Sequence, residues 1–155
     1  MIEQRWVFVV QALDKPGVLT ATASVFSNRG VSLEGILGSG IAATTAEDAR
    51  LILSFRAVER KKDLLLRALQ RLAKVIHVEA YLYTDPRLRA IAIARVVNLD
   101  NLGLNTDSLQ TELISQTPEG TTVLFTGSTT AVETAVATLR QNRVLIDVVG
   151  SAIAV

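Results

Sequence analysis

L-D-K-P-G-V-L-T-A-T-A-S-V-F-S-N-R-G-V-S-L, from Leu13 to Leu33, is the stretch around which the rest of the chain is arranged. Asp14, Pro16 and Gly17 indicate a tight turn after an apolar strand, with Pro16 expected in the first turn of a helix. Gly30 is well placed to end that helix in the left-handed conformation. The apolar face of the predicted helix consists of Val18, Leu19, Thr22, Val25 and Phe26.

The start of this helix is a candidate ligand site. A turn that leads straight into a helix leaves backbone N–H groups unpaired, and the positive end of the helix dipole lies beside them. These groups suit a carboxylate or a phosphate. Gly17 has no side chain, so a ligand can approach the backbone closely there.

Composition excludes several classes of function. The chain has 155 residues, 49% of them hydrophobic, and a net charge of +1, so one domain or two small ones can fold around a core without a strong pull toward nucleic acid or membrane. It contains no cysteine, and its apolar runs are too interrupted for a membrane span. The opening M-I-E-Q-R-W has no signal-peptide pattern, so we expect a cytoplasmic protein.

The first half predicts the order βαββαβ. The first strand is apolar on both faces, which is typical of a central strand covered on both sides. Right-handed crossovers then give an antiparallel sheet with both helices on one face. Beyond the helix that follows Gly17, the predicted segments are strands at 5–12, 31–41, 49–57 and 75–84, a loop at 42–48 and a helix at 61–74.

The second half reads as a shortened copy of the first. Asp85-Pro86 breaks the pattern, which places domains at residues 1–84 and 85–155. Only residues 98–108 separate its first two strands, so most of the first helix is missing. Thr130 and Glu133 have the spacing of a capping box before the remaining helix. The predicted strands are 88–97, 109–115, 121–126 and 144–155, with a hairpin at T-P-E-G.

Three strings resemble a known family. D-K-P-G-V-L at 14–19, inside βαββαβ, resembles the ACT domain, a ferredoxin-like regulatory module that binds amino acids. The longer G-V-L-x-x-x-x-x-V-F-S-x-R-G-V-S-L at 17–33 is similar to the small regulatory subunit of acetohydroxyacid synthase, also called acetolactate synthase. L-x-R-L-A-K-V-I-H-V at 69–78 resembles the same subunit. The resemblance implies an α+β fold, with a ferredoxin-like ACT domain followed by a second, trimmed ferredoxin-like half.

The resemblance also implies an amino-acid site. The ligand carboxylate is expected at the N–H groups near Gly17 and Val18, and its ammonium at Asp14. ACT dimers pair their second strands, so a neighbour's strand is expected to complete the pocket. The alternatives left open are that Asp14 is an ordinary turn or cap residue, and that 32–35 is a plain edge strand with a bulge. The candidate site residues are Asp14, Lys15, Pro16, Gly17, Val18, Leu19, Ser32 and Leu33.

The chain departs from the usual sequence of this subunit at the ligand site. The family usually has Asn where this chain has Asp14 and Ser32, and a basic residue where it has Ala21. An ionised Asp14 only accepts hydrogen bonds, and Ser32 reaches less far than Asn. The departures predict that this chain binds valine more weakly than typical members do. Binding to the partner enzyme is expected to be retained better than the response to valine.

Catalytic and metal chemistry find no support in the sequence. His77 is the only histidine, so a Ser–His–Asp set and a histidine metal site are both improbable, and His77 is expected at the surface or an interface. No phosphate loop or nucleophile elbow occurs, and no cofactor is implied. The basic residues of the second helix are expected to form a solvated face: Arg60, Lys61, Lys62, Arg67, Arg71 and Lys74.

The resulting expectation is a non-catalytic homodimer that binds a small amino acid, valine or similar. The resemblance implies that it modulates the catalytic subunit of acetohydroxyacid synthase, in branched-chain amino-acid biosynthesis. The alternative is a stand-alone amino-acid sensor or a structural dimer with no synthase partner. Neither nucleic acid nor membrane is expected as a partner.

Overall fold

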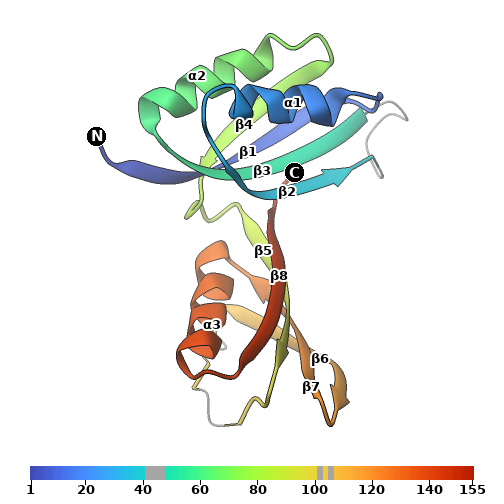
Figure 1. Cartoon of the computed structure of the whole chain (residues 1–155), viewed down its shortest axis with the longest axis vertical. Coiled ribbons are helices and arrows are strands. Elements are labelled where there is room, and N and C mark those ends of the chain that lie inside the picture. Colours follow the sequence, from blue (N-terminus) through green and yellow to red (C-terminus); the bar gives the residue numbers. More distant parts are fainter. Residues whose placement is uncertain (41–47, 101–102, 105–106) are drawn as a thin grey trace. The chain divides into compact units, whose positions relative to one another are not determined.

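The chain divides into two compact units. The structure is a computed structural model, and it describes residues 1–40, 48–100, 103–104 and 107–155. The first unit is formed by Met1–Asp85 together with Ala154–Val155, and the second by Pro86–Ile153. Each unit is an antiparallel sheet of four strands with its helical layer on one face (Figure 1). No helix in the described ranges is long and apolar enough to cross a membrane.

The first unit has the predicted order βαββαβ. Its strands pair in the order β2-β3-β1-β4, all antiparallel, so β1 is central and β2 and β4 are the edges. Figure 1 shows α1 and α2 together on one face of this sheet. The elements are β1 (Glu3–Leu13), α1 (Val18–Ser27), β2 (Leu33–Ser39), β3 (Asp48–Val58), α2 (Glu59–Gln70) and β4 (Val75–Leu82).

The apolar pattern of β1 explains its central place. Phe8 packs with Phe26 of α1 and Phe55 of β3, and the ring centroids of Phe8 and Phe55 lie 4.7 Å apart. Val7 and Val9 point to the opposite face and are also buried. A strand with apolar side chains on both faces is most stable between two other strands, because the side chains of β3 and β4 flank its own on each face.

The ends of several elements differ from the prediction. β2 begins at Leu33 rather than Val31, because the Val31 N–H donates to the Phe26 carbonyl and still belongs to the end of α1. Gly30 has φ +67°, as expected for a helix stop. α2 begins at Glu59, directly after β3, and ends at Gln70 instead of continuing to position 74. Most of the predicted loop at 42–48 lies outside the described residues, but position 48 already belongs to β3.

The second unit has the expected shortened topology. Its strands pair in the order β6-β7-β5-β8, with α3 against one face. The described residues between β5 and β6 contain no helix, so they provide no counterpart of α1, as predicted. The elements are β5 (Arg89–Val96), β6 (Leu109–Thr117), β7 (Gly120–Gly127), α3 (Thr129–Gln141) and β8 (Leu145–Ile153).

The central strand β5 alternates strictly between buried and exposed positions. Ala90, Ala92, Ala94 and Val96 face the core that α3 covers. The small alanines let the helix approach the sheet closely, with Phe125 as the large side chain of this core.

The capping box expected at Thr130 and Glu133 is wrong. α3 begins at Thr129, and its N-cap is Ser128, whose Oγ accepts a hydrogen bond from the Ala131 N–H at 3.1 Å. The reason is that β7 ends at Gly127, so Ser128 is still extended, with ψ 155°, while Thr130 already lies inside the helix.

Replacing Gly120 by Ala is expected to destabilise the second unit by about 1–3 kcal/mol. Gly120 has φ +151°, and a Cβ there would lie 3.0 Å from the Val96 carbonyl oxygen, which cannot move aside because it belongs to β5. Urea unfolding of the full chain, followed by circular dichroism, measures the change. Gly103→Ala is the control, because Gly103 has φ +61° but no described atom near the added Cβ. Equal losses in the two variants would mean that the contact with β5 is unimportant.

Candidate functional site

The turn between β1 and α1 presents the start of the helix to solvent. The Lys15 N–H donates to the Leu13 carbonyl at 2.9 Å, and Gly17 then takes φ +85° as the N-cap of α1. No side chain caps this helix end in the described part of the chain, and its first turn contains no acidic residue. The Val18 N–H donates to the Lys15 carbonyl at 3.4 Å and the Ala21 N–H to the Gly17 carbonyl at 2.9 Å. The N–H groups between them, at Leu19 and Thr20, and the positive end of the dipole are available to an anion.

One expectation about this turn is wrong, and one of the alternatives left open is excluded. Pro16 lies before the helix, not in its first turn, because α1 begins at Val18. Asp14 is not the helix cap, since Gly17 holds that position. Gly17 is required by its left-handed φ and not by crowding, because no described atom lies within 4 Å of an added Cβ.

The residues of the turn differ in exposure. Asp14, Lys15, Pro16 and Gly17 are exposed, whereas Val18 is buried in the core of the first unit. Leu19 was expected on the buried face of the helix but is 51% exposed. Its side chain adds an apolar surface next to the free helix end.

The Asp14 side chain lies beside the end of β2. A Cβ added at Gly40 would be 2.5 Å from Asp14 Oδ2, so a residue larger than glycine at position 40 would displace the carboxylate. Within the described ranges, no hydrogen bond or ion pair engages that carboxylate. Asp14 is thus an exposed anion close to the free end of α1.

Ser32 and Leu33 do not join Asp14 within one chain. They follow the carboxyl end of α1, where the Val31 N–H bonds to Phe26, while Asp14 precedes the amino end of the helix. A helix of ten residues is about 15 Å long. The eight residues selected from the sequence are therefore split into two groups, 14–19 and 32–33, at opposite ends of α1.

Sequence reasoning missed a small pocket on the side of α1 that faces α2. Its walls are Gly17, Val18, Ala21 and Thr22 of the first helix and the segment 72–75 that joins α2 to β4. Its volume is about 200 Å³. Lys74 Nζ donates to the Pro16 carbonyl at 3.0 Å, which holds the lysine head beside the turn. The resemblance of 69–78 to the regulatory subunit was the only sequence signal that pointed to this segment.

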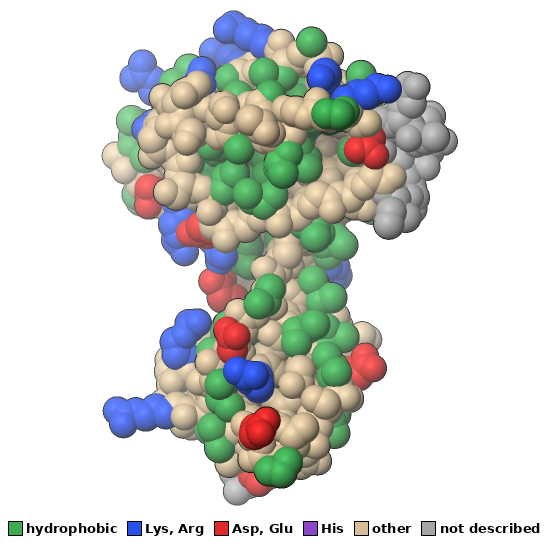
Figure 2. Space-filling model, turned by 45° about the vertical axis from the view of Figure 1, so that its right-hand side comes forward, with side chains coloured by type: hydrophobic (Ala, Val, Ile, Leu, Met, Phe, Trp, Pro, Cys, Tyr) green, Lys and Arg blue, Asp and Glu red, His purple; other side chains and the backbone are tan. Residues whose placement is uncertain are grey.

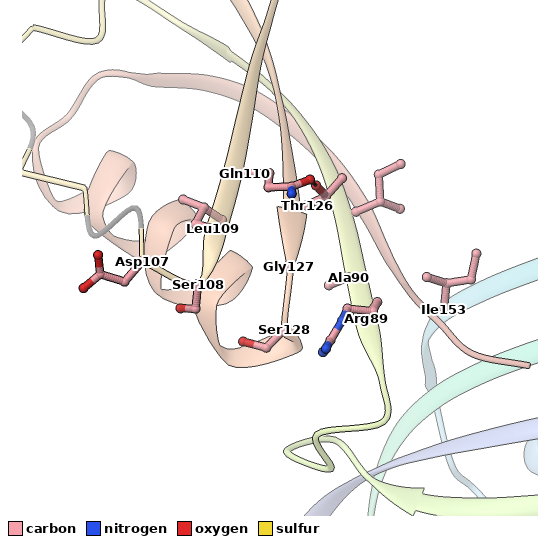
Figure 3. A pocket seen from close by; sticks show the side chains of 11 residues that line it. Arg89, Ala90, Asp107, Ser108, Leu109, Gln110, Thr126, Gly127, Ser128 and Ile153 are labelled. Carbon is pink, nitrogen blue, oxygen red and sulfur yellow. Dashed lines mark hydrogen bonds between the residues drawn. The ribbon is translucent and has the colours of Figure 1, made fainter.

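A larger depression lies in the second unit. Its volume is about 680 Å³, and Figure 3 shows Arg89, Asp107, Gln110 and Ser128 around it. Much of this polar lining is already engaged: Arg89 donates to the Pro86 and Leu88 carbonyls, and Ser128 caps α3. The depression therefore offers fewer free polar groups than the start of α1.

The other residues selected from the sequence lie on the surface. His77 is exposed on β4, and its Nε2 lies 3.0 Å from Glu79 Oε1. Within the described ranges, no three His, Asp or Glu side chains gather to hold a metal ion. The predicted solvated face is wrong at Lys62, whose side chain is only 12% exposed, with its Nζ 4.7 Å from the centroid of the Trp6 ring and 2.6 Å from Asp63 Oδ1. The other basic residues are exposed, on α2 or just after its end: Arg60, Lys61, Arg67, Arg71 and Lys74. Figure 2 shows Lys and Arg side chains on the helical side of the first unit.

Comparison with known proteins gives a likeness in structure but not in sequence. No protein-family model and no curated protein matches the chain. The small subunit of acetolactate synthase from Thermotoga maritima superposes with a TM-score of 0.73 at 19% identity, over 97% of this chain and 96% of that one.

Two weaker likenesses have TM-scores below 0.5. The regulatory subunit of aspartate kinase from Thermus thermophilus gives 0.47 at 15% identity, over 91% of this chain and 93% of that one. The ACT domain of GTP pyrophosphokinase from Chlorobium tepidum gives 0.45 at 17% identity, over 52% of this chain and 89% of that domain. The superposition on the Thermotoga maritima protein shows that the chain has, over nearly its whole length, the α+β fold of the acetolactate synthase small subunit, with a ferredoxin-like ACT unit followed by a shortened one.

Proposed function

We propose that this chain is a non-catalytic, cytoplasmic regulatory protein that binds a small amino acid and modulates the catalytic subunit of an acetolactate synthase. The observation that carries the proposal is the free amino end of α1, uncapped beside the exposed carboxylate of Asp14, in a chain whose fold matches that small subunit from end to end. The proposed partner rests on the likeness to that small subunit, and the proposed ligand rests on the resemblance to ACT domains and on the chemistry of the turn.

The chemistry of the turn suits a zwitterion. The ligand carboxylate bonds to the backbone N–H groups of Leu19 and Thr20 in the first turn of α1, where the helix dipole favours negative charge. The ligand ammonium pairs with Asp14, which lies on the β2 side of the turn. Leu19 supplies an apolar surface for a small aliphatic side chain.

Two copies paired through β2 would complete this site. β2 is an edge strand, and antiparallel pairing about its middle residue, Ile36, sets the start of one strand beside the end of the other. The partner's Ser32 and Leu33 then lie next to Gly40, and Gly40 lies next to Asp14. The two groups of site residues, which one chain keeps apart, meet in the dimer.

Ile36→Lys is expected to shift the chain from dimer to monomer. Two Ile36 residues face each other in the symmetric pair, so the substitution sets two positive charges opposite one another and removes apolar contact. Ile36 is 49% exposed. The control is Ile76→Lys on the other edge strand, where the isoleucine is 52% exposed. Light scattering at micromolar concentration measures the mass; a monomeric parent, or equal behaviour of the two variants, contradicts pairing through β2.

Reconstitution with a synthase tests the proposal as a whole. The full chain is mixed with an acetolactate synthase catalytic subunit from the same source, and both co-purification and activity are measured with and without valine. Complex formation with altered activity supports the proposal, and the departures at Asp14 and Ser32 predict a weak valine response. If the chain neither binds the catalytic subunit nor changes its activity, the regulatory proposal is wrong, and the alternative is a stand-alone sensor or a structural dimer.

A further inference from the structure

Charge is unevenly distributed over the first unit. Residues 15–32 and 58–74, which form α1, α2 and the turns beside them, contain eight lysine or arginine residues and two acidic ones, a net charge of +6. The other residues of 1–85 contain three lysine or arginine residues and seven acidic ones, a net charge of −4. The helical side of this unit is therefore strongly positive, and a field of this kind attracts a partner of opposite charge.

Three arginines and a leucine form one stripe on α2. Arg60, Leu64, Arg67 and Arg71 follow one another at steps of four, three and four residues, which places them on one face of the helix. Arg71 directly follows the helix and is still helical, with φ −84° and ψ −12°. The two buried leucines of α2 lie on the opposite face. This arginine stripe is therefore turned away from the core, and it is about 16 Å long.

The guanidinium groups of the arginine stripe are unpaired. Within the described ranges no hydrogen bond or ion pair engages its three arginine side chains, and all three are exposed. The lysines between them are engaged, since Lys61 donates to the Arg29 carbonyl at 3.2 Å and Lys62 pairs with Asp63. No acidic residue belongs to the stripe itself. Its charges are thus available to carboxylates of another molecule.

Leu64 gives the arginine stripe an apolar centre. Its side chain is 47% exposed, between Arg60 and Arg67. Protein–protein interfaces are enriched in arginine, depleted in lysine, and built around an apolar centre. Nucleic acid fits this surface less well, because α2 has no aromatic side chain on which a base could stack, and phosphates offer nothing to an exposed leucine. The composition of the stripe favours an acidic protein surface.

We propose that the arginine stripe is the surface through which this chain docks on an acidic region of the acetolactate synthase catalytic subunit. The inference rests on the proposed function and adds the chemistry of the contact: carboxylates of the partner pair with the guanidinium groups, and an apolar side chain of the partner contacts Leu64. A helix face of about 16 Å by about 10 Å is roughly a fifth of the ~800 Å² that each partner buries in a standard interface. The stripe is therefore the charged centre of a wider contact.

A matched pair of double variants tests the charges. Arg67→Gln with Arg71→Gln is compared with Arg140→Gln with Arg143→Gln in the second unit, because each pair removes one arginine from the last turn of a helix and one just beyond its end. Binding of the full chain to the catalytic subunit from the same source is measured by surface plasmon resonance at about 50 and about 300 mM salt. We expect the α2 variant to bind about 30-fold more weakly at low salt, mainly through slower association, and the control within about twofold of the parent. The affinity of the α2 variant should also depend less on salt.

Leu64→Ala tests the apolar centre, with Leu113→Ala as its control. Leu113 is 57% exposed on β6 of the second unit. Leu64→Ala should weaken binding about tenfold through faster dissociation, and Leu113→Ala should leave it unchanged. Urea unfolding should give the stability of the parent for these variants, because the altered side chains are exposed. A loss of binding then does not reflect unfolding.

The outcomes separate this inference from the proposed function. If the parent binds the catalytic subunit and the α2 double variant binds it equally well, the arginine stripe is not the docking surface, while the proposed function stands. If the parent does not bind at either salt concentration, the proposed function is wrong and the docking surface with it. Tighter binding of the parent to a fluorescein-labelled RNA duplex than to the catalytic subunit would assign the stripe to nucleic acid instead.

Discussion

Phe55→Ala is expected to lower the free energy of unfolding of the first unit by about 3–5 kcal/mol. Phe55 is fully buried, and its ring centroid lies 4.7 Å from that of Phe8 and 5.0 Å from that of Phe26. Its removal leaves a cavity between β3, β1 and α1 and breaks two edge-to-face contacts. The loss is comparable with the whole stability of many small domains, so the first unit should be largely unfolded at modest urea concentrations.

The fluorescence of Trp6 measures this effect. Trp6 is the only tryptophan and belongs to the same core, with its Nε1–H donating to the Ala57 carbonyl at 3.1 Å. Phe55→Leu is the matched control, because it keeps most of the volume and should lose clearly less stability than the alanine variant. A loss below about 1 kcal/mol for Phe55→Ala would show that the three rings do not form a tight cluster.

Asp14→Ala is expected to weaken amino-acid binding by about 1.5–3 kcal/mol, or roughly 10- to 150-fold in Kd. The variant removes the acceptor for the ligand ammonium but leaves the backbone N–H groups of α1 in place. Calorimetry with valine and similar amino acids on the full chain measures the change. A carboxylic acid without the amino group should bind at this turn equally well in the parent and the variant, since it does not use Asp14.

Glu119→Ala provides the control for a general charge effect. Glu119 is an exposed acid in the turn between β6 and β7, in the other unit. Its removal changes the net charge by the same amount and should leave amino-acid binding unchanged. Unaltered affinity in Asp14→Ala would place the amino-acid site elsewhere. Strong valine inhibition of a reconstituted synthase that disappears in Asp14→Ala would show that Asp14 replaces the family's asparagine without loss.

The sequence was sufficient for the fold because its signals were local. The two apolar faces around Val7 and Phe8 predicted a central strand, and β1 is central. The short spacing between 97 and 109 predicted the shortened second unit. The cap of α3 was harder to predict from the sequence, because Ser128, Thr129 and Thr130 are all good capping residues. The position where β7 ends decides which of them is the N-cap.

The candidate site was only partly visible in the sequence, for a physical reason. The turn at 14–19 is a contiguous motif, so its chemistry could be read directly. The sequence predicted only that Thr22 lies on the apolar face of a helix. That its hydroxyl is unpaired depends on how the 72–75 segment, fifty residues later, packs against α1. Periodicity reports which side of a helix is buried, but not whether a buried polar atom finds a partner.

The pair of His77 and Glu79 on β4 bears on how large an assembly this chain can form. In the proposed pair, β2 of both copies is used, and β4 lies at the two ends of the joined sheet. The exposed polar pair of His77 and Glu79 makes that remaining edge strand less suited to further pairing than an apolar one, as charged residues do in other sheets. In such a pair, growth of the sheet beyond two copies is disfavoured at both ends.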